Sequence, residues 1–432
     1  MKHFSRTLSA AAAIAMCVTV ASAVRGDEGK QPAEGPNRYV VTNLTSDLPG
    51  IAPNTDPVLQ NAWGVAFTPG ASPFWVADNA TGCSTLYDGT GVPQPQPMPL
   101  QVKLPLPGGS VPATACQPVD PNNPPQPTPA APTGLVWNPT ATFLVPQTPF
   151  PPATFIWATE NGTIAAWTGG LTPRDEAVLA VDNSPDAVYK GLAFGTNVHG
   201  VFLFATNFRA GTIDVFAANG SAGFRPATAT EIEGDFTDPN LPDGFAPFGI
   251  QNINGDLFVT YALQNEEKHD DVAGPGNGFV DIFDTNGHFL RRFASGGALN
   301  SPWGVVRASF AFGQFSGDIL VGNFGDGKIN AFTSDGTFRD TLKDADGAPI
   351  VIDGLWVLTL GGGRNSNSDT LYFTAGPNSE TDGLFGTITP APTNLIADKE
   401  GIRRLRGPRL RTLREGEGAK SHDHPVADVA LD

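Results

Sequence analysis

Short apolar runs separated by turn residues follow one another along most of the chain, in an order that recurs six times. Each copy has a glycine between apolar residues, a β-rich apolar run, then Asp or Asn with small residues, and a second apolar run. The copies begin at Trp63, Thr133, Lys190, Phe248, Trp303 and Asp353, and the glycines that follow stand 50 to 70 residues apart. Such a repeat predicts an all-β protein, a six-bladed β-propeller with one four-stranded blade per copy.

Turn signals support this division. Asn-Gly or Asp-Gly pairs stand between apolar runs at 88–89, 219–220, 286–287 and 335–336, and both residue types tolerate the positive φ of tight hairpin turns. The sixth copy offers only three strands, over 355–360, 370–374 and 383–389. We expect residues 38–45 to supply the missing outer strand, because an N-terminal strand closing the last blade would close the ring and cover its exposed edge.

The chain divides into four segments. A basic start, an apolar stretch and Ala21-Ser22-Ala23 predict a cleaved signal peptide over 1–23. The propeller is expected over 38–390, interrupted by a proline-rich insertion at 92–132 between the first two blades, since a central strand does not tolerate 14 prolines. The arginine-rich end, 391–432, is predicted to be a disordered tail.

Composition narrows the location and the partners. The formal charge of −17 argues against nucleic-acid binding, which needs clustered Lys and Arg. The apolar run of the signal is too short for an integral membrane span. We therefore expect an exported monomer, periplasmic or extracellular, whose partner is a small molecule or an envelope or extracellular protein.

Two cysteines remain once the signal is removed, Cys83 and Cys116. In an oxidising compartment they favour a disulfide that fixes the proline-rich insertion to the first blade. The alternative is two separate buried thiols.

Polar residues end several of the second strands. Asp78, Glu160, Asn207 and Asn323 are expected at one mouth of the central channel, and Asp353 begins the sixth inner strand on the same side. Carboxylates and amides there would bind a cation or a polar ligand. The alternative is local, because Asp and Asn also open turns by bonding their own backbone.

The segment 264–278 (QNEEKHDDVAGPGNG) replaces a short turn on the same face. We expect it to fold over the mouth, where five side chains are candidate ligands of a divalent cation, Ca²⁺ first and Mn²⁺ or Zn²⁺ otherwise. They are Glu266, Glu267, His269, Asp270 and Asp271. The alternative is a solvated acidic loop.

Other local patterns carry no chemistry. Gly322 to Lys328 spells part of a phosphate loop, but Ile329 stands where Ser or Thr would bind Mg²⁺. No nucleophile elbow, zinc motif or CxxC is present, so no catalytic residue is assigned. The seven tryptophans are expected to pack between blades, with a sugar-stacking surface as the alternative for one or two.

Residues 63–88 (WGVAFTPGASPFWVADNATGCSTLYD) resemble the NHL-type repeat. Residues 39–390 resemble a bacterial family of exported conserved hypothetical propellers often associated with PEP-CTERM/exosortase sorting systems, most specifically at 268–281 (KHDDVAGPGNGFVD). The resemblance implies a six-bladed ring and export, and it implies no activity.

Two functions are consistent with the sequence. The first is a binding or scaffold propeller that presents its channel mouth to a small ligand, a cation or a protein. The alternative is a Ca²⁺-type, metal-dependent, lactonase-like hydrolase. Against the hydrolase, the residues beginning the inner strands include only one carboxylate, Asp353.

Overall fold

The computed structural model describes residues 35–70 and 72–392. The predicted signal peptide, 1–23, lies outside the described residues, as does the predicted tail apart from its first two residues, so export stays a prediction. None of the helices in the described ranges is long and apolar enough to cross a membrane.

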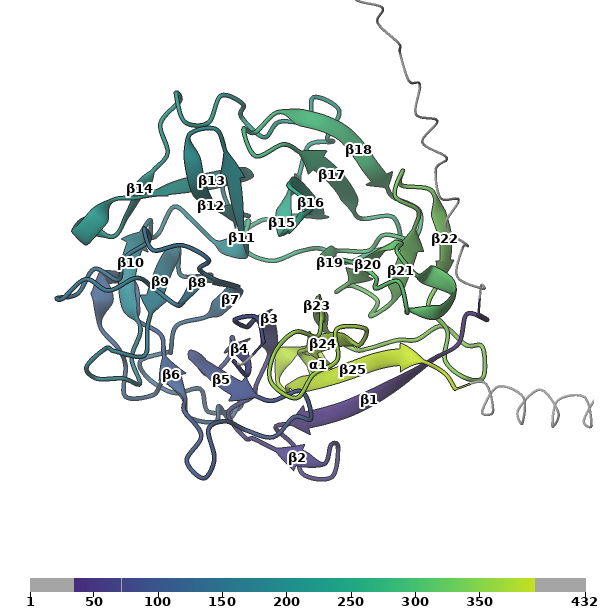
Figure 1. Cartoon of the computed structure of the whole chain (residues 1–432), viewed down its shortest axis with the longest axis horizontal. Helices are drawn as coiled ribbons and strands as arrows, with labels where there is room; N and C mark the ends of the chain where they lie inside the picture. Colours follow the sequence, from purple (N-terminus) through teal and green to yellow (C-terminus); the bar gives the residue numbers. More distant parts are fainter. Residues whose placement is uncertain (1–34, 71, 393–432) are drawn as a thin grey trace, which may run out of the picture.

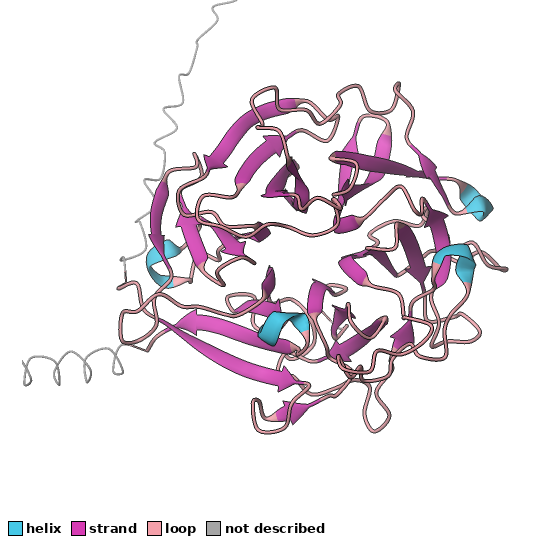
Figure 2. Cartoon of the chain, turned by 180° about the vertical axis from the view of Figure 1, so that it is seen from behind, coloured by secondary structure: helices cyan, strands magenta, loops and turns pink. Residues whose placement is uncertain are grey.

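Six antiparallel sheets stand around a common centre, which confirms the six-bladed propeller (Figures 1 and 2). Blade 1 has β3 (Ala62–Ala66), β4 (Phe74–Asp78), β5 (Cys83–Tyr87) and β6 (Val102–Lys103); blade 2 has β7 (Pro132–Trp137), β8 (Phe155–Thr159), β9 (Thr163–Trp167) and β10 (Val178–Asp182). Blade 3 has β11 (Tyr189–Asn197), β12 (Gly200–Asn207), β13 (Thr212–Ala218) and β14 (Phe224–Pro226); blade 4 has β15 (Phe245–Ile253), β16 (Asp256–Leu263), β17 (Phe279–Phe283) and β18 (Phe289–Ser295). Blade 5 has β19 (Pro302–Arg307), β20 (Ile319–Asn323), β21 (Ile329–Phe332) and β22 (Phe338–Thr341).

Blade 6 joins the two ends of the propeller. Its strands are β23 (Leu355–Leu360), β24 (Leu371–Ala375), β25 (Leu384–Pro390) and β1 (Tyr39–Ser46), with the short β2 (Asn54–Thr55) beside β1. Strand β1 pairs antiparallel with β25 from Tyr39 opposite Pro390 to Ser46 opposite Leu384, as Figure 1 shows at the lower edge of the ring. The predicted N-terminal closing strand is confirmed, one residue later than expected.

Helical segments are short in the part of the chain described. They are η1 (Pro107–Gly109), η2 (Gly220–Ala222), η3 (Gly313–Phe315) and α1 (Pro377–Glu380).

The core lies between neighbouring blades. Alternation along β4 turns Trp75 toward blade 2, where its ring centroid lies 4.4 Å from that of Phe155, and turns Phe74 toward blade 6, 4.6 Å from Tyr372. Trp157 and Trp167 lie in the same cluster as Trp75, so these tryptophans pack between blades as predicted.

The repeated glycine permits close approach of the inner strands. A Cβ added at five of these glycines would lie between 2.1 and 2.9 Å from backbone atoms of the next inner strand. They are Gly64, Gly134, Gly191, Gly249 and Gly304. The alignment of the sixth copy on Gly354 is wrong, because the pairing of Leu358 with Phe373 makes Val357 the equivalent residue.

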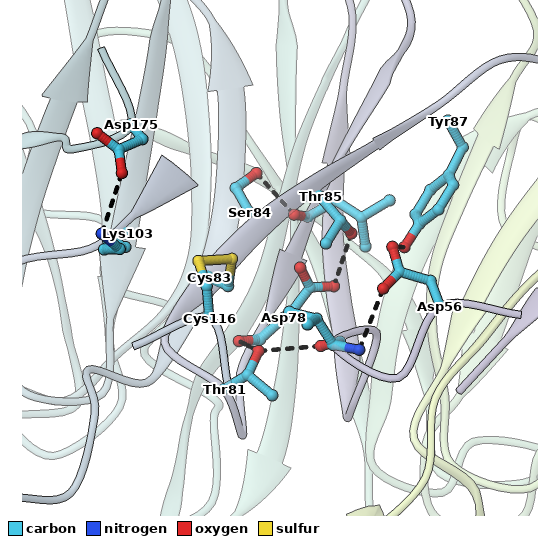
Figure 3. Close-up of a disulfide and its surroundings, with 12 residues drawn as sticks. Asp56, Asp78, Thr81, Cys83, Ser84, Thr85, Tyr87, Lys103, Cys116 and Asp175 are labelled. Carbon is cyan, nitrogen blue, oxygen red and sulfur yellow. Dashed lines mark hydrogen bonds and ion pairs between the residues drawn. A yellow bond between two sulfur atoms is a disulfide. The ribbon is translucent and has the colours of Figure 1, made fainter. Parts of the chain in front are cut away.

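The proline-rich insertion is fixed to blade 1 by a disulfide between Cys83 and Cys116, whose Cα atoms are 4.9 Å apart (Figure 3). The predicted disulfide is confirmed and the alternative of separate thiols is wrong. The insertion also supplies β6, the outer strand of blade 1, and Lys103 Nζ of that strand lies 3.0 Å from Asp175 Oδ2.

Candidate functional site

Strand register defines two rings of side chains at one end of the channel. Each inner strand pairs with its second strand, and then a bulge releases the next residue from regular pairing. These released residues are Trp63, Thr133, Lys190, Phe248, Trp303 and Trp356. On each second strand, the residue one position after the partner of the last residue before the bulge forms the outer ring: Asn79, Glu160, Phe208, Ala262, Phe324 and Gly376. Each ring therefore contains a single charged residue, Lys190 in the inner ring and Glu160 in the outer.

Aromatic side chains of both rings close the channel at this end. Trp63 stacks on Trp356 with 3.5 Å between ring centroids, Trp303 meets both edge-on, and Phe324 stacks on Trp356 at 4.0 Å. Behind them, the inner strands enclose a space of about 40 Å³. These three tryptophans pack across the channel rather than between blades, which corrects the interblade assignment for them. The mouth is therefore a shallow site with an aromatic floor.

Lys190 is the charged centre of the mouth. Its side chain is 2% exposed, and its ammonium forms an ion pair with Glu160 and lies 3.6 Å from Asp270 Oδ1. The ammonium also lies over the rings of Trp63 and Phe208, 5.2 and 5.8 Å from their centroids. Burial alone would lower the pKa of Lys190, but the charge and hydrogen bond of Glu160, together with the charges of Asp270 and Glu380, raise it. Lys190 is therefore a buried cation.

A chain of amide hydrogen bonds extends the site to blades 1 and 6. Asn79 Nδ2 donates to Glu160 Oε2 at 3.0 Å. Asn61 Nδ2 donates to Asn79 Oδ1 at 3.2 Å and to Glu380 Oε2 at 2.7 Å, while Trp356 Nε1 donates to Asn61 Oδ1 at 3.0 Å. The two asparagines thus hold the carboxylates of Glu160 and Glu380 in place.

The 264–278 segment reaches this mouth. His269 Nδ1 lies 2.8 Å from Asp270 Oδ1, and one ligand atom each from Glu160, His269 and Asp270 lie within 4.8 Å of one another. The hydrogen bond between His269 and Asp270 raises the pKa of the histidine and lowers that of the aspartate. The segment therefore brings two of its five candidate ligands to Glu160.

The other three candidates do not belong to this group of ligand atoms. Glu266 and Glu267 are exposed. Asp271 is half-buried, burial raises its pKa, and its Oδ2 has no hydrogen-bond partner among the described residues.

Register explains why the predicted rim residues do not assemble. Ala62 pairs with Asp78 but Pro132 pairs with Thr159, so Glu160 is equivalent to Asn79 and not to Asp78. Asp78 lies on the same face of β4 as Phe74, toward blade 6, and is fully buried, and Thr85 Oγ1 donates to its Oδ1 at 3.2 Å (Figure 3). Burial, and then the charge of Asp56, hold the pKa of Asp78 well above its usual range.

Three further predicted residues serve nearby turns. Asn207 Oδ1 accepts from the backbone N–H groups of Val188 and Ala210, and Asn323 Nδ2 donates to the carbonyl of Ala298 at 2.8 Å. Asp353 is exposed and accepts a hydrogen bond from the backbone of Asn378. The structure therefore places Glu160 at the mouth and the remaining four rim candidates elsewhere.

Several residues at or beside the mouth have a left-handed backbone conformation. Asn61 has φ 47°, Lys268 has 53° and Ser301 has 44°, and residues 378–380 have 57°, 56° and 66° in succession. Non-glycine residues adopt this conformation at a cost, and such strain concentrates where structure serves binding. Three of these positions adjoin or belong to the polar cluster, namely Asn61, Lys268 beside His269, and Glu380.

Burial and then the charge of Glu160 raise the pKa of Glu380 from 4.5 to about 7. Between about pH 4.5 and 7 the folded protein therefore holds a proton on Glu380 that the unfolded chain has released. The contribution of this proton to stability is complete below about pH 4.5 and is lost as pH rises through about 7. We compare the Tm of Glu380→Gln with that of the unsubstituted protein at two pH values. This Tm difference is expected to be roughly 2–4 °C more favourable to the variant at pH 8 than at pH 5. Parallel Tm profiles for the two proteins would contradict this, and Glu266→Gln is the exposed control.

Comparisons with known proteins identify relatives. No protein-family model matches the chain. By fold, a streptogramin B lyase structure covers 82% of this chain and 98% of its own, at 12% identity and a TM-score of 0.44. The gluconolactonase XC5397 from Xanthomonas campestris covers 77% of this chain and 86% of its own, at 11% identity and a TM-score of 0.43.

By sequence, the uncharacterized protein R648 of Acanthamoeba polyphaga mimivirus is 30% identical over 362 residues, which are 82% of this chain and 82% of R648. This relative is viral, so the bacterial origin and the sorting-system association stay predictions. The chain belongs to the same protein family as R648.

Proposed function

We propose that this protein is a non-catalytic binding propeller whose channel mouth takes a small, positively charged organic ligand. One observation carries the proposal: the carboxylates of Glu160, Asp270 and Glu380, from three separate segments, lie around the single buried ammonium of Lys190. Three carboxylates surround one lysine and one histidine. The mouth is thus net negative while His269 is neutral, and a cationic ligand would be attracted to it.

Access to the site also supports this proposal. The Asp270 side chain is 63% exposed and that of His269 is 37% exposed, whereas Lys190 and Glu160 lie beneath them. A ligand would therefore meet Asp270 and His269 first, and its ammonium would donate charge-assisted hydrogen bonds to the carboxylate.

A larger groove of about 510 Å³ lies along blade 3, lined by residues such as Ile213, Phe216 and Phe236. Both of its carboxylates already accept hydrogen bonds, Asp214 from Tyr189 Oη at 2.7 Å and Asp235 from the backbone N–H of Thr237 at 3.1 Å. The carboxylates of the mouth are instead gathered around one ammonium, so we place the binding function at the mouth.

The test is a thermal-shift and calorimetric screen of small amines such as putrescine, agmatine and glucosamine. Asp270→Asn is expected to weaken binding of any hit by about tenfold or more, the value of a hydrogen bond to a charged group. Glu266→Gln removes the same charge from the same segment without touching the cluster, and should change the affinity little. Equal affinities of the D270N and E266Q variants would reject the mouth as the site.

The second candidate, a metal-dependent lactonase-like hydrolase, is favoured by the grouping of Glu160, His269 and Asp270 ligand atoms within 4.8 Å. Ca²⁺ requires six to eight oxygen ligands, and Zn²⁺ accepts imidazole and carboxylate. Retention of a stoichiometric cation by the purified protein, lost together with activity on lactones after chelation, would favour this candidate over the first.

A further inference from the structure

The space between Glu160 and Asp270 already holds a cation. Lys190 Nζ contacts both carboxylates, and these are two of the three groups that come together as possible metal ligands. The second oxygen of Glu160 accepts a hydrogen bond from Asn79 at 3.0 Å, so both oxygens of this carboxylate are engaged.

The Lys190 ammonium is held where it is. Its side chain rises from the inner strand β11, and its Nζ rests over the rings of Trp63 and Phe208 at the aromatic floor. The side chain is 2% exposed, so a metal ion arriving from solvent would meet a fixed positive charge beside its ligands. The metal ion and the Lys190 ammonium would repel each other strongly, because two like charges close together in a buried site are poorly screened by water.

The position of Lys190 in its ring is also informative. The equivalent residues of the other five blades are Trp63, Thr133, Phe248, Trp303 and Trp356, all uncharged. Uncharged side chains at this position therefore suffice to close the channel, and a lysine is not needed for that purpose. A buried lysine is costly unless it is paired, so its presence points to a role in the electrostatics of the mouth.

We propose that Lys190 is the specificity-determining residue of the mouth: its ammonium takes the place of a divalent cation, excludes metal ions from Glu160, His269 and Asp270, and reserves the exposed carboxylate for an organic cation. This inference rests on the proposed binding function. It predicts that removing the ammonium turns the mouth into a metal site.

The experiment compares the unsubstituted protein, Lys190→Gln, Lys190→Arg, Asp270→Asn and the double variant K190Q/D270N. Each is titrated with Zn²⁺ and separately with Ca²⁺ by calorimetry, with tryptophan fluorescence, to which Trp63 contributes, as a second signal. K190Q is expected to gain one Zn²⁺ site at least 100-fold tighter than any mouth site of the unsubstituted protein. K190R keeps the charge and should gain none, and K190Q/D270N should lose the gain.

Two results would overturn the inference. One is a Zn²⁺ or Ca²⁺ site in the unsubstituted protein that D270N removes, and the other is a folded K190Q with no gain. If K190Q does not fold without metal, its refolding by Zn²⁺ supports the inference and its failure to refold counts against it. The comparison of the unsubstituted protein with D270N tests the exclusion of metal ions from the mouth without any change at position 190.

The same data separate this inference from the proposed function. Amine binding that depends on Asp270, with no Zn²⁺ gain in K190Q, would reject the role of Lys190 and keep the binding function. If K190Q gains a Zn²⁺ site but the unsubstituted protein binds no amine, the binding function is rejected. The role of Lys190 in excluding metal ions from the mouth is then kept.

Discussion

A chain that begins at Asp47 is expected to be insoluble or largely unfolded at 37 °C. The truncation removes β1, which pairs with β25 along its length, and leaves blade 6 with three strands and an open edge. It also removes Tyr39, which is 1% exposed, stacks on Phe312 at 4.8 Å and donates to the Phe312 carbonyl at 2.9 Å. Strand β1 therefore joins blade 5 as well as blade 6.

Two point variants in β1 test the same prediction through the free energy of unfolding. Tyr39→Ala should cost about 3–5 kcal/mol, as expected for a large buried aromatic side chain. Thr42→Ala, at an exposed position of the same strand, should stay within about 0.5 kcal/mol. Denaturant unfolding measures both. A truncated protein that is monomeric and as stable as the full chain would show that β1 does not close the ring.

Gly249→Ala is expected to destabilise the protein by roughly 3 kcal/mol or more, the upper range for overpacking. The added Cβ would lie 2.1 Å from the carbonyl oxygen of Trp303, in the next blade, and 2.9 Å from Thr260 Oγ1. Because the first of these atoms belongs to a paired inner strand, it cannot move aside cheaply.

Gly170→Ala is the matched control, since a Cβ there meets nothing within 4 Å and the residue has no positive φ. It should be neutral or slightly stabilising, by up to about 1 kcal/mol. Chemical denaturation of the two variants tests the comparison. Equal stability would mean that the repeated glycine does not set the spacing of the inner ring.

The sequence predicted the architecture well because the glycine and the Asn-Gly or Asp-Gly turns recur at nearly fixed places in each blade. It aligned the sixth blade incorrectly because Val357 occupies the glycine position there, while Gly354 belongs to a turn with φ 64°. A single substitution in a five-fold pattern was enough to shift the alignment.

The candidate site was predicted in part. The 264–278 segment and Glu160 were expected at the mouth, and the structure brings His269 and Asp270 to Glu160. Asp78 was misplaced because one residue of register reverses the side of a strand on which a side chain lies.

Other members of the site were missed. Asn61 and Glu380 lie 319 positions apart in sequence, so only ring closure shows that they meet. Lys190 was visible at the start of its inner strand, but Asp353 stood in the same set as a second charge until the sixth copy was aligned on Trp356. In the corrected ring Lys190 is the single charge among four aromatic residues and Thr133, and that contrast is the signal that would have identified it.

The central claim is that the mouth around Glu160, Lys190 and Asp270 is where this propeller binds its ligand. The most direct measurement is a crystal structure of the protein with the amine that gives the largest thermal shift. We expect electron density beside the exposed side chains of His269 and Asp270, with the ligand ammonium within hydrogen-bond distance of the Asp270 carboxylate. Ordered ligand in the groove of blade 3, with the mouth unchanged, would contradict it.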